Sequence, residues 1–145
     1  MAATPHGIAH GSNRPVVMGR NGMVCAGHPL ASQAGISVLQ KGGNAVDAAI
    51  AVAAALNVVE PPMSGMGGDG FILVRWNGAE NGRRKRGVRV VNATGAAPQT
   101  ATRESYLPDG IPMKGAGSVS VPGLLDGWAE AHGAYGDLKW SEVFE

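Results

Sequence analysis

The side chains that could carry chemistry are spread singly along the 145-residue chain. Cys25, the one cysteine, lies in the apolar run MVCAG, which predicts a buried and unreactive thiol. Asp47 follows Asn44 by three residues, the spacing of a helix capping box. Asp69 stands in the glycine-rich stretch SGMGGDG, where it could cap a turn or face a pocket, and we favour the turn. No GxSxG elbow, HExxH motif or cysteine cluster completes a catalytic set.

Histidines and basic residues do not form a recognisable site either. His6 and His10 have the spacing of metal ligands on a helix, but the proline and glycines around them argue against a helix. The basic run Arg83 to Arg86 follows turn dipeptides and has no interleaved aromatic residues, and the net charge is only +1. We therefore predict a solvated hairpin tip and no nucleic-acid partner. The glycine loop precedes a strand instead of opening a helix, so a nucleotide cofactor is not expected.

The stretch Gly42–Trp76 has the clearest structural pattern. Asn44 is placed as an N-cap, residues 45–56 are nearly all Ala, Val, Ile or Leu, and Pro61 and Pro62 end the helix. A helix that is apolar all round is expected to be buried on most sides. After the glycine loop, FILVRW at 71–76 predicts a short buried strand.

Helix and strand signals alternate elsewhere, which predicts a mixed, layered α/β fold. We expect a helix that follows His28 and ends near Gly42, with a cap or loop role for this histidine and not a catalytic one. Further predicted elements are short strands at 23–26, 88–92 and 117–123, a short helix near Thr102, a helix at 124–136 with Leu125, Trp128, Ala129 and His132 on one side, and the start of another helix at 137–145.

The N-terminal segment differs in composition from the rest. Residues 1–15 are polar and aperiodic, which predicts a disordered tail before one structured unit at 16–145. The tail has no apolar signal segment, and the run at 45–59 is short and rich in alanine for a membrane span. A cytoplasmic location without membrane association is therefore expected, with an export signal missing from this start as the alternative.

Two motifs carry a resemblance to a known family. GGNAVDAAIA at 42–51 and GMGGDGF at 65–71 together resemble the gamma-glutamyltransferase family of N-terminal-nucleophile hydrolases, and the resemblance extends from about residue 22 to about residue 135. It implies the four-layer αββα sandwich of that class. This chain would supply its N-terminal portion, truncated within the large subunit.

The resemblance also implies an activity whose nucleophile is elsewhere. Members of the family cleave their own precursor, and the new N-terminal threonine of the small subunit attacks the amide with its α-amino group as base. That threonine would lie beyond Glu145, so we expect no catalytic residue in this chain and no cofactor. The implied partners are the rest of the large subunit, the small subunit and a small amide substrate such as a gamma-glutamyl compound. The alternatives are an acylase or amidohydrolase on non-glutamyl amides, and a non-catalytic or partner-binding fragment.

One substrate-binding position of the family falls within this chain. In members that act on glutathione, the arginine of an Arg-Glu-x-Ala-Pro motif binds the substrate α-carboxylate, and here the matching segment 94–98 reads TGAAP. Thr94 replaces the arginine, so the carboxylate clamp is missing, as in less typical branches of the family. Arg75 or Arg103 could supply a substitute charge. Thr94→Arg with Gly95→Glu is expected to raise gamma-glutamyl activity.

Overall fold

The computed structural model describes residues 15–145, so the predicted tail, apart from Pro15, and the pair His6 and His10 lie outside the described residues. The described part is a mixed α/β unit with α1 (Pro29–Gln40), α2 (Ala45–Val59), β1 (Phe71–Trp76), β2 (Gly87–Asn92) and α3 (Leu124–Tyr135). The short 3-10 helices in it are η1 (Glu104–Tyr106), η2 (Ala116–Ser118) and η3 (Trp140–Val143). Within the same residues, no helix is long and apolar enough to cross a membrane.

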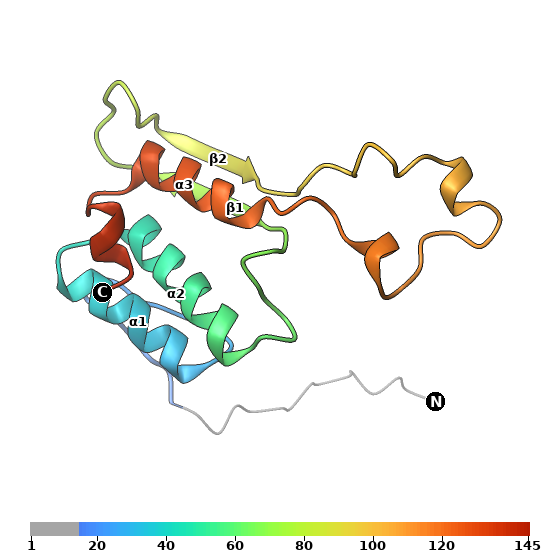
Figure 1. The fold of residues 1–145 in the computed structure, drawn as a ribbon. Coiled ribbons are helices and arrows are strands. Elements are labelled where there is room, and N and C mark those ends of the chain that lie inside the picture. Colours follow the sequence, from blue (N-terminus) through green and yellow to red (C-terminus); the bar gives the residue numbers. More distant parts are fainter. Residues whose placement is uncertain (1–14) are drawn as a thin grey trace, which may run out of the picture.

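Helix α1 begins and ends at the predicted residues. His28 Nδ1 accepts a hydrogen bond from the Leu30 N–H at 3.2 Å, which confirms a capping role for this histidine. At the other end Gly42 has φ of 94°, and the N–H groups of Gly42 and Gly43 donate to carbonyls of the last turn at 3.2 and 3.0 Å. This is the Schellman pattern, and it turns the chain directly into α2, which lies beside α1 (Figure 1).

Helix α2 runs through the centre of the body, between α1 and the layer that contains α3 and the hairpin (Figure 1). Its predicted capping box is present: Asn44 Oδ1 accepts from the Val46 and Asp47 N–H groups at 2.8 and 3.2 Å, and Asp47 Oδ2 accepts from the Asn44 N–H at 2.9 Å. The main apolar core is formed by Val38, Val46, Ala48, Ile50, Ala51, Val74, Leu124, Trp128, Ala131, Tyr135 and Val143. The expected burial on most sides is only partly correct, because Ala49 and Val58 are exposed.

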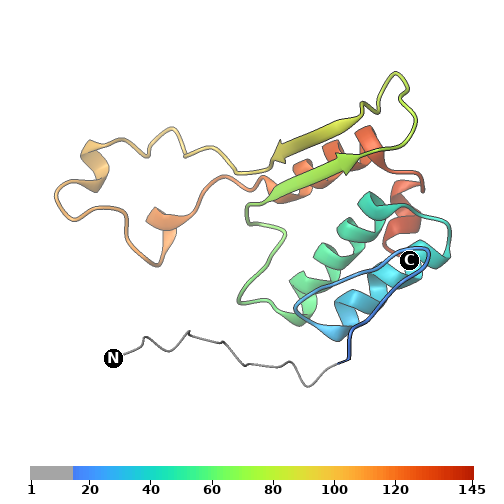
Figure 2. The same ribbon diagram turned by 180° about the vertical axis from the view of Figure 1, so that it is seen from behind.

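Strands β1 and β2 form an antiparallel hairpin, with Phe71 opposite Asn92 and Trp76 opposite Gly87. Helix α3 covers one face of the hairpin: it lies in front of the strands in Figure 1 and behind them in Figure 2. The outer face carries four large apolar side chains that are 52–71% exposed, namely Phe71, Leu73, Val88 and Val90. The prediction of a buried strand therefore holds only for the inner face of β1, where Val74 is buried.

Two predicted elements are wrong and a third is only partly correct. Residues 23–26 do not form a strand, because no neighbouring backbone in the described chain pairs with them. Residues 117–123 contain the end of η2 and an irregular segment instead of a strand. In residues 137–145 a helix does begin at Trp140, as expected, but it is η3, a short 3-10 helix, and not an α-helix.

Helix α3 occupies the predicted range, and the predicted Trp128 is buried, but the other residues of its buried side differ from the prediction. Its buried side chains are Leu124, Trp128, Ala131 and Tyr135, whereas the predicted Leu125 and Ala129 are exposed. Gly127 lies on this buried side of the helix as well. An ideal Cβ on Gly127 would lie 2.2 Å from Ala93 Cβ, so the helix backbone rests directly on the end of the hairpin at this glycine. The close contact at Gly127 therefore lies on the same side of the helix as Leu124, Trp128 and Ala131.

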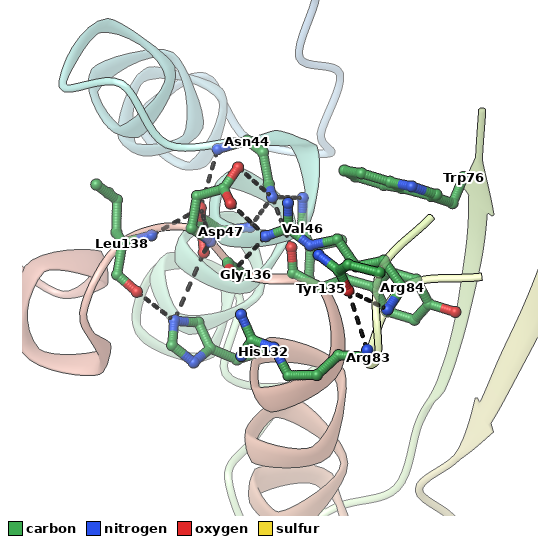
Figure 3. A network of polar contacts seen from close by, with 12 residues as sticks. Asn44, Val46, Asp47, Trp76, Arg83, Arg84, His132, Tyr135, Gly136 and Leu138 are labelled. Carbon is green, nitrogen blue, oxygen red and sulfur yellow. Dashed lines mark hydrogen bonds and ion pairs between the residues drawn. The ribbon is translucent and has the colours of Figure 1, made fainter. Parts of the chain in front are cut away.

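The prediction of a solvated hairpin tip is only partly correct, because Lys85 and Arg86 are exposed but Arg84 is half-buried and anchored. The Arg84 guanidinium lies 4.8 Å from the centre of the Trp76 ring, donates to the Gly136 carbonyl at 2.9 Å and forms an ion pair with Asp137 (Figure 3). Arg83 donates to the Gly133 carbonyl at 2.9 Å. Carbonyls at a helix C-terminus attract cations, so the end of α3 holds the first half of the basic run.

Asp47 is a buried junction as well as a capping residue. Its side chain is 0% exposed, and its carboxylate accepts from the N–H groups of Asp137 and Leu138 at 3.0 and 3.3 Å (Figure 3). His132 Nε2 lies 3.5 Å from Asp47 Oδ1 and 2.9 Å from the Leu138 carbonyl oxygen. The start of α2 is thereby fastened to the turn that follows α3.

Candidate substrate-binding loop

Thr94, the predicted site residue, lies just beyond the end of β2. It is exposed, and its N–H donates to the Asn92 side-chain oxygen at 3.0 Å. From here residues 97–119, called the arm below, run away from the body as a long loop that contains η1 and η2 (Figure 1). The arm returns to the body beside the point where it leaves. Thr94 therefore stands at the base of the arm, on the surface.

Three segments meet at this base, and we call them the neck: residues 68–70, 93–96 and 120–124. The hairpin ladder continues into the neck, where the Ala93 N–H donates to the Gly70 carbonyl at 2.9 Å. The Val121 N–H donates to the Ala96 carbonyl at 3.0 Å, which closes the arm on itself. The N–H groups of Gly123 and Leu124 share the Gly68 carbonyl at 3.3 and 3.0 Å. The glycine loop thus binds the backbone where α3 begins.

Two glycines allow the neck to be this tight. An ideal Cβ on Gly95 would lie 1.3 Å from the Val121 carbonyl oxygen, and one on Gly123 would lie 2.5 Å from the Ala93 carbonyl oxygen. Backbone atoms occupy the space that a side chain would need, so neither position accepts a larger residue without movement of the neck. Gly95→Glu, which the sequence comparison with the family motif suggested alongside Thr94→Arg, therefore does not fit this structure.

Asp69 binds the other two segments of the neck. Its Oδ1 accepts from the Gly95 N–H at 3.1 Å, and the Ser120 hydroxyl lies 2.8 and 2.9 Å from its two carboxylate oxygens. The Gly95 N–H, followed by the Ser120 hydroxyl, lowers the pKa of this exposed carboxyl below its ordinary value. The favoured prediction of a local turn role is wrong, since both partners lie far away in the sequence.

The two arginines considered as substitutes occupy separate places. Arg75 is exposed on the outer face of β1, opposite Val88, whereas Asn92 is opposite Phe71. Four strand residues separate the two positions, which is about 13 Å along the hairpin. Arg103 is exposed in the arm, immediately before η1. The structure describes no ion pair from either arginine to the neck within residues 15–145.

The remaining candidate groups do not form a catalytic set in the described chain. Cys25 is exposed, so the prediction of a buried thiol is wrong; the neighbouring Val24 is the residue that faces α1, next to Gly35. His28 and His132 are engaged in the contacts given above. Among residues 15–145 no group of three or more His, Cys, Asp or Glu side chains could hold a metal ion. The neck therefore contains a largely exposed loop, residues 94–96, which is held in place by hydrogen bonds.

Comparisons with known proteins identify the family of this chain and show that its relatives are longer. The family model described as gamma-glutamyltranspeptidase matches residues 31–145, and the chain belongs to this family. It is 42% identical over 131 residues to the glutathione hydrolase-like YwrD proenzyme of Bacillus subtilis, covering 89% of this chain and 24% of that protein. It is 41% identical over 139 residues to the Acylase ACY 1 proenzyme of a Pseudomonas species, covering 88% of this chain and 24% of that protein.

Solved structures agree as well. The gamma-glutamyltranspeptidase from Pseudomonas nitroreducens complexed with L-DON superimposes with a TM-score of 0.73 at 34% identity, over 87% of this chain and 37% of that one. The chain thus spans about a quarter of the length of the curated relatives named here. The resemblance given by GGNAVDAAIA and GMGGDGF is confirmed, and so is the mixed α/β class.

Proposed function

We propose that this chain is the N-terminal part of the large subunit of an enzyme of the gamma-glutamyltranspeptidase family, one that cleaves a gamma-glutamyl or other small amide bond. The threonine nucleophile would lie in polypeptide beyond Glu145. The proposal rests on the difference between the length of the relatives and the part of it that this chain covers. The chain aligns with about a quarter of two proteins that are named proenzymes, while the histidine bonds in residues 15–145 go to the backbone of Leu30 and Leu138 and not to a serine, threonine or cysteine side chain.

The outer face of the hairpin supports the same proposal. A β-sheet that leaves Phe71, Leu73, Val88 and Val90 in water is short of a covering layer, since contiguous exposed apolar surface of this kind marks contact sites. In the proposed complete enzyme, the second sheet of the four-layer αββα sandwich covers this face. The remainder of the large subunit and the small subunit would supply that layer.

We further propose that Thr94 lies on the side of the substrate where relatives acting on glutathione bind the α-carboxylate. A threonine hydroxyl supplies one weak bond there, where a guanidinium supplies two charge-assisted bonds. The difference in binding is on the order of 2–3 kcal/mol. This residue therefore favours the second candidate, an acylase or amidohydrolase whose substrate carries no α-carboxylate, and the similarity to an acylase proenzyme supports it.

The proposal is tested on the polypeptide encoded by the complete reading frame that contains this chain. Mass spectrometry of the purified product is expected to find two fragments, the second beginning with threonine. A single uncleaved polypeptide with no amide hydrolysis would contradict the proposed function.

Two substrates then separate the two candidates. 4-Aminobutyryl anilide is gamma-glutamyl anilide without its α-carboxylate. Without a carboxylate clamp, kcat/KM for the two anilides is expected to agree within about tenfold. A preference for the glutamyl compound on the order of a hundredfold would mean that another group replaces the missing arginine, and that the acylase candidate is wrong.

A further inference from the structure

We propose that Asp69 is a positioning residue for the loop 94–96, and that its bonds to Gly95 and Ser120 hold this loop in the conformation that meets the substrate. The role of the loop rests on the function proposed above. The clasp itself, meaning Asp69 with its two partners, rests only on the geometry of the neck.

The clasp holds the loop from one side and the returning arm from the other. Gly95 is the residue after Thr94, and its N–H points at Asp69 Oδ1, 3.1 Å away. Ser120, at the end of the arm, reaches both oxygens of the same carboxylate. One side chain on the glycine loop therefore joins two segments that lie 26 and 51 residues further along the chain.

Backbone contacts limit where the clasp can hold the loop. The Gly95 Cα is in such close contact with the Val121 carbonyl that the loop cannot move towards the returning arm. Asp69 acts on the Gly95 N–H and so fixes the peptide plane between Thr94 and Gly95. The two contacts together restrain the backbone at Gly95, and with it the position of Thr94 at the base of the arm.

A carboxylate suits this task better than a neutral acceptor. Both of its partners are donors, and an ionised carboxylate accepts from each with charge-assisted strength. An asparagine in the same place would retain one acceptor for the Gly95 N–H and would have to turn its amide nitrogen to the serine oxygen. The lowered pKa of Asp69 is consistent with these donors, since both favour the ionised form.

The clasp is exposed, so its loss should loosen the neck without unfolding the body. Asp69 is not part of the apolar core, and water can replace its bonds. This makes Asp69→Ala a variant that can be studied in the folded state. Glu130→Gln is the matched control, because Glu130 is an exposed carboxylate on α3 outside the neck.

The first experiment is amide hydrogen exchange of the chain, followed by mass spectrometry. In Asp69→Ala, peptides covering 93–96 and 119–124 are expected to exchange on the order of tenfold faster, while α2 keeps its protection. Asp69→Asn should lie between wild type and Asp69→Ala, and Glu130→Gln should match wild type. Unchanged exchange of both neck peptides in Asp69→Ala would overturn the proposal.

The second experiment measures anilide hydrolysis by the complete enzyme. Asp69→Ala is expected to raise KM on the order of tenfold and to leave kcat within about twofold, because a misplaced loop weakens binding and does not touch the nucleophile. Ser120→Ala should raise KM by less. Faster exchange with unchanged KM would overturn the positioning role. If wild type itself hydrolyses no amide, the function proposed above fails, and the exchange experiment still decides whether Asp69 fixes the loop.

Discussion

Asp47 and Asp69 both join segments that are distant in the sequence, but one carboxylate is wholly buried and the other is exposed. Asp47 accepts from three backbone N–H groups, those of Asn44, Asp137 and Leu138, and its carboxylate is wholly buried inside the body. Asp69 holds two donors that water also reaches. The same residue type therefore serves stability in the first region and local positioning in the second, because burial decides what an unmade hydrogen bond costs.

The largest effect is expected from Asp47→Ala. This change removes a wholly buried acceptor from three part-buried backbone N–H groups and should lower the free energy of unfolding by about 3–5 kcal/mol. Urea denaturation followed by far-UV circular dichroism measures it, with Glu130→Gln as the exposed control. A loss below about 1 kcal/mol would remove the contrast between the two aspartates.

The next effect is expected from Gly95→Ala. The new methyl group would overlap the Val121 carbonyl oxygen, so the neck must open, at a cost of about 1–3 kcal/mol. Limited proteolysis should then cut the arm faster than in wild type. Gly82→Ala is the control, since nothing lies within 4 Å of an added Cβ there. Equal cleavage rates in both variants would mean that the neck is not tightly closed.

A smaller effect is expected at the hairpin tip. Arg84→Ala removes the contact with Trp76 and the bonds to Gly136 and Asp137, and should cost about 1–2 kcal/mol. Lys85→Ala, at the exposed neighbouring position, should be near neutral. Urea unfolding of the two variants makes the comparison, and equal stabilities would mean that the tip is solvated after all.

The hairpin tip also predicts a pH dependence. The hydrogen bond from Arg84 is the main cause that lowers the pKa of the Asp137 carboxyl below its ordinary 3.8. A lowered pKa in the folded state gives stability that is present above the ordinary value and is lost as the pH falls through the folded value. Below about pH 4, wild type should therefore lose more stability than Arg84→Ala does. Parallel stability curves of the two proteins would contradict this link.

The smallest effect on stability is expected from Thr94→Arg, because Thr94 is exposed. In the complete enzyme this change should raise the preference for gamma-glutamyl over 4-aminobutyryl anilide roughly tenfold, through a new charge-assisted bond to the α-carboxylate. The ratio of the two kcat/KM values measures it, and Thr100→Arg in the arm is the control. An unchanged ratio would place Thr94 away from the substrate.

Local patterns in the sequence predicted the parts of the fold whose partners are near in the chain. The Asn44–Asp47 box and the glycine end of α1 depend on residues a few positions apart, and the two strands are joined by one short connection with turn dipeptides, so propensity and spacing were sufficient. Residues 23–26 have the composition of a strand, but a strand also needs a neighbouring backbone, and the described chain supplies none there.

The candidate site could be predicted only in part. The family motif pointed to Thr94 as a candidate, but local patterns do not specify the partners of Asp69 or the Asp137 partner of Arg84, because these lie 26 to 53 residues away. The glycines were the available signal. Gly95, Gly123 and Gly127 each stand where backbone or side-chain atoms leave no room for a Cβ, and a concentration of glycines in so short a chain indicates such close contacts.

The most direct measurement is the hydrolysis of gamma-glutamyl and 4-aminobutyryl anilides by the purified 145-residue chain, beside the complete polypeptide at the same concentration. If the attacking hydroxyl belongs to sequence outside this chain, the 145 residues release no aniline above the buffer rate, while the complete polypeptide turns over after cleaving itself. Sustained turnover by the 145-residue chain alone, abolished by a substitution within it, would contradict that claim.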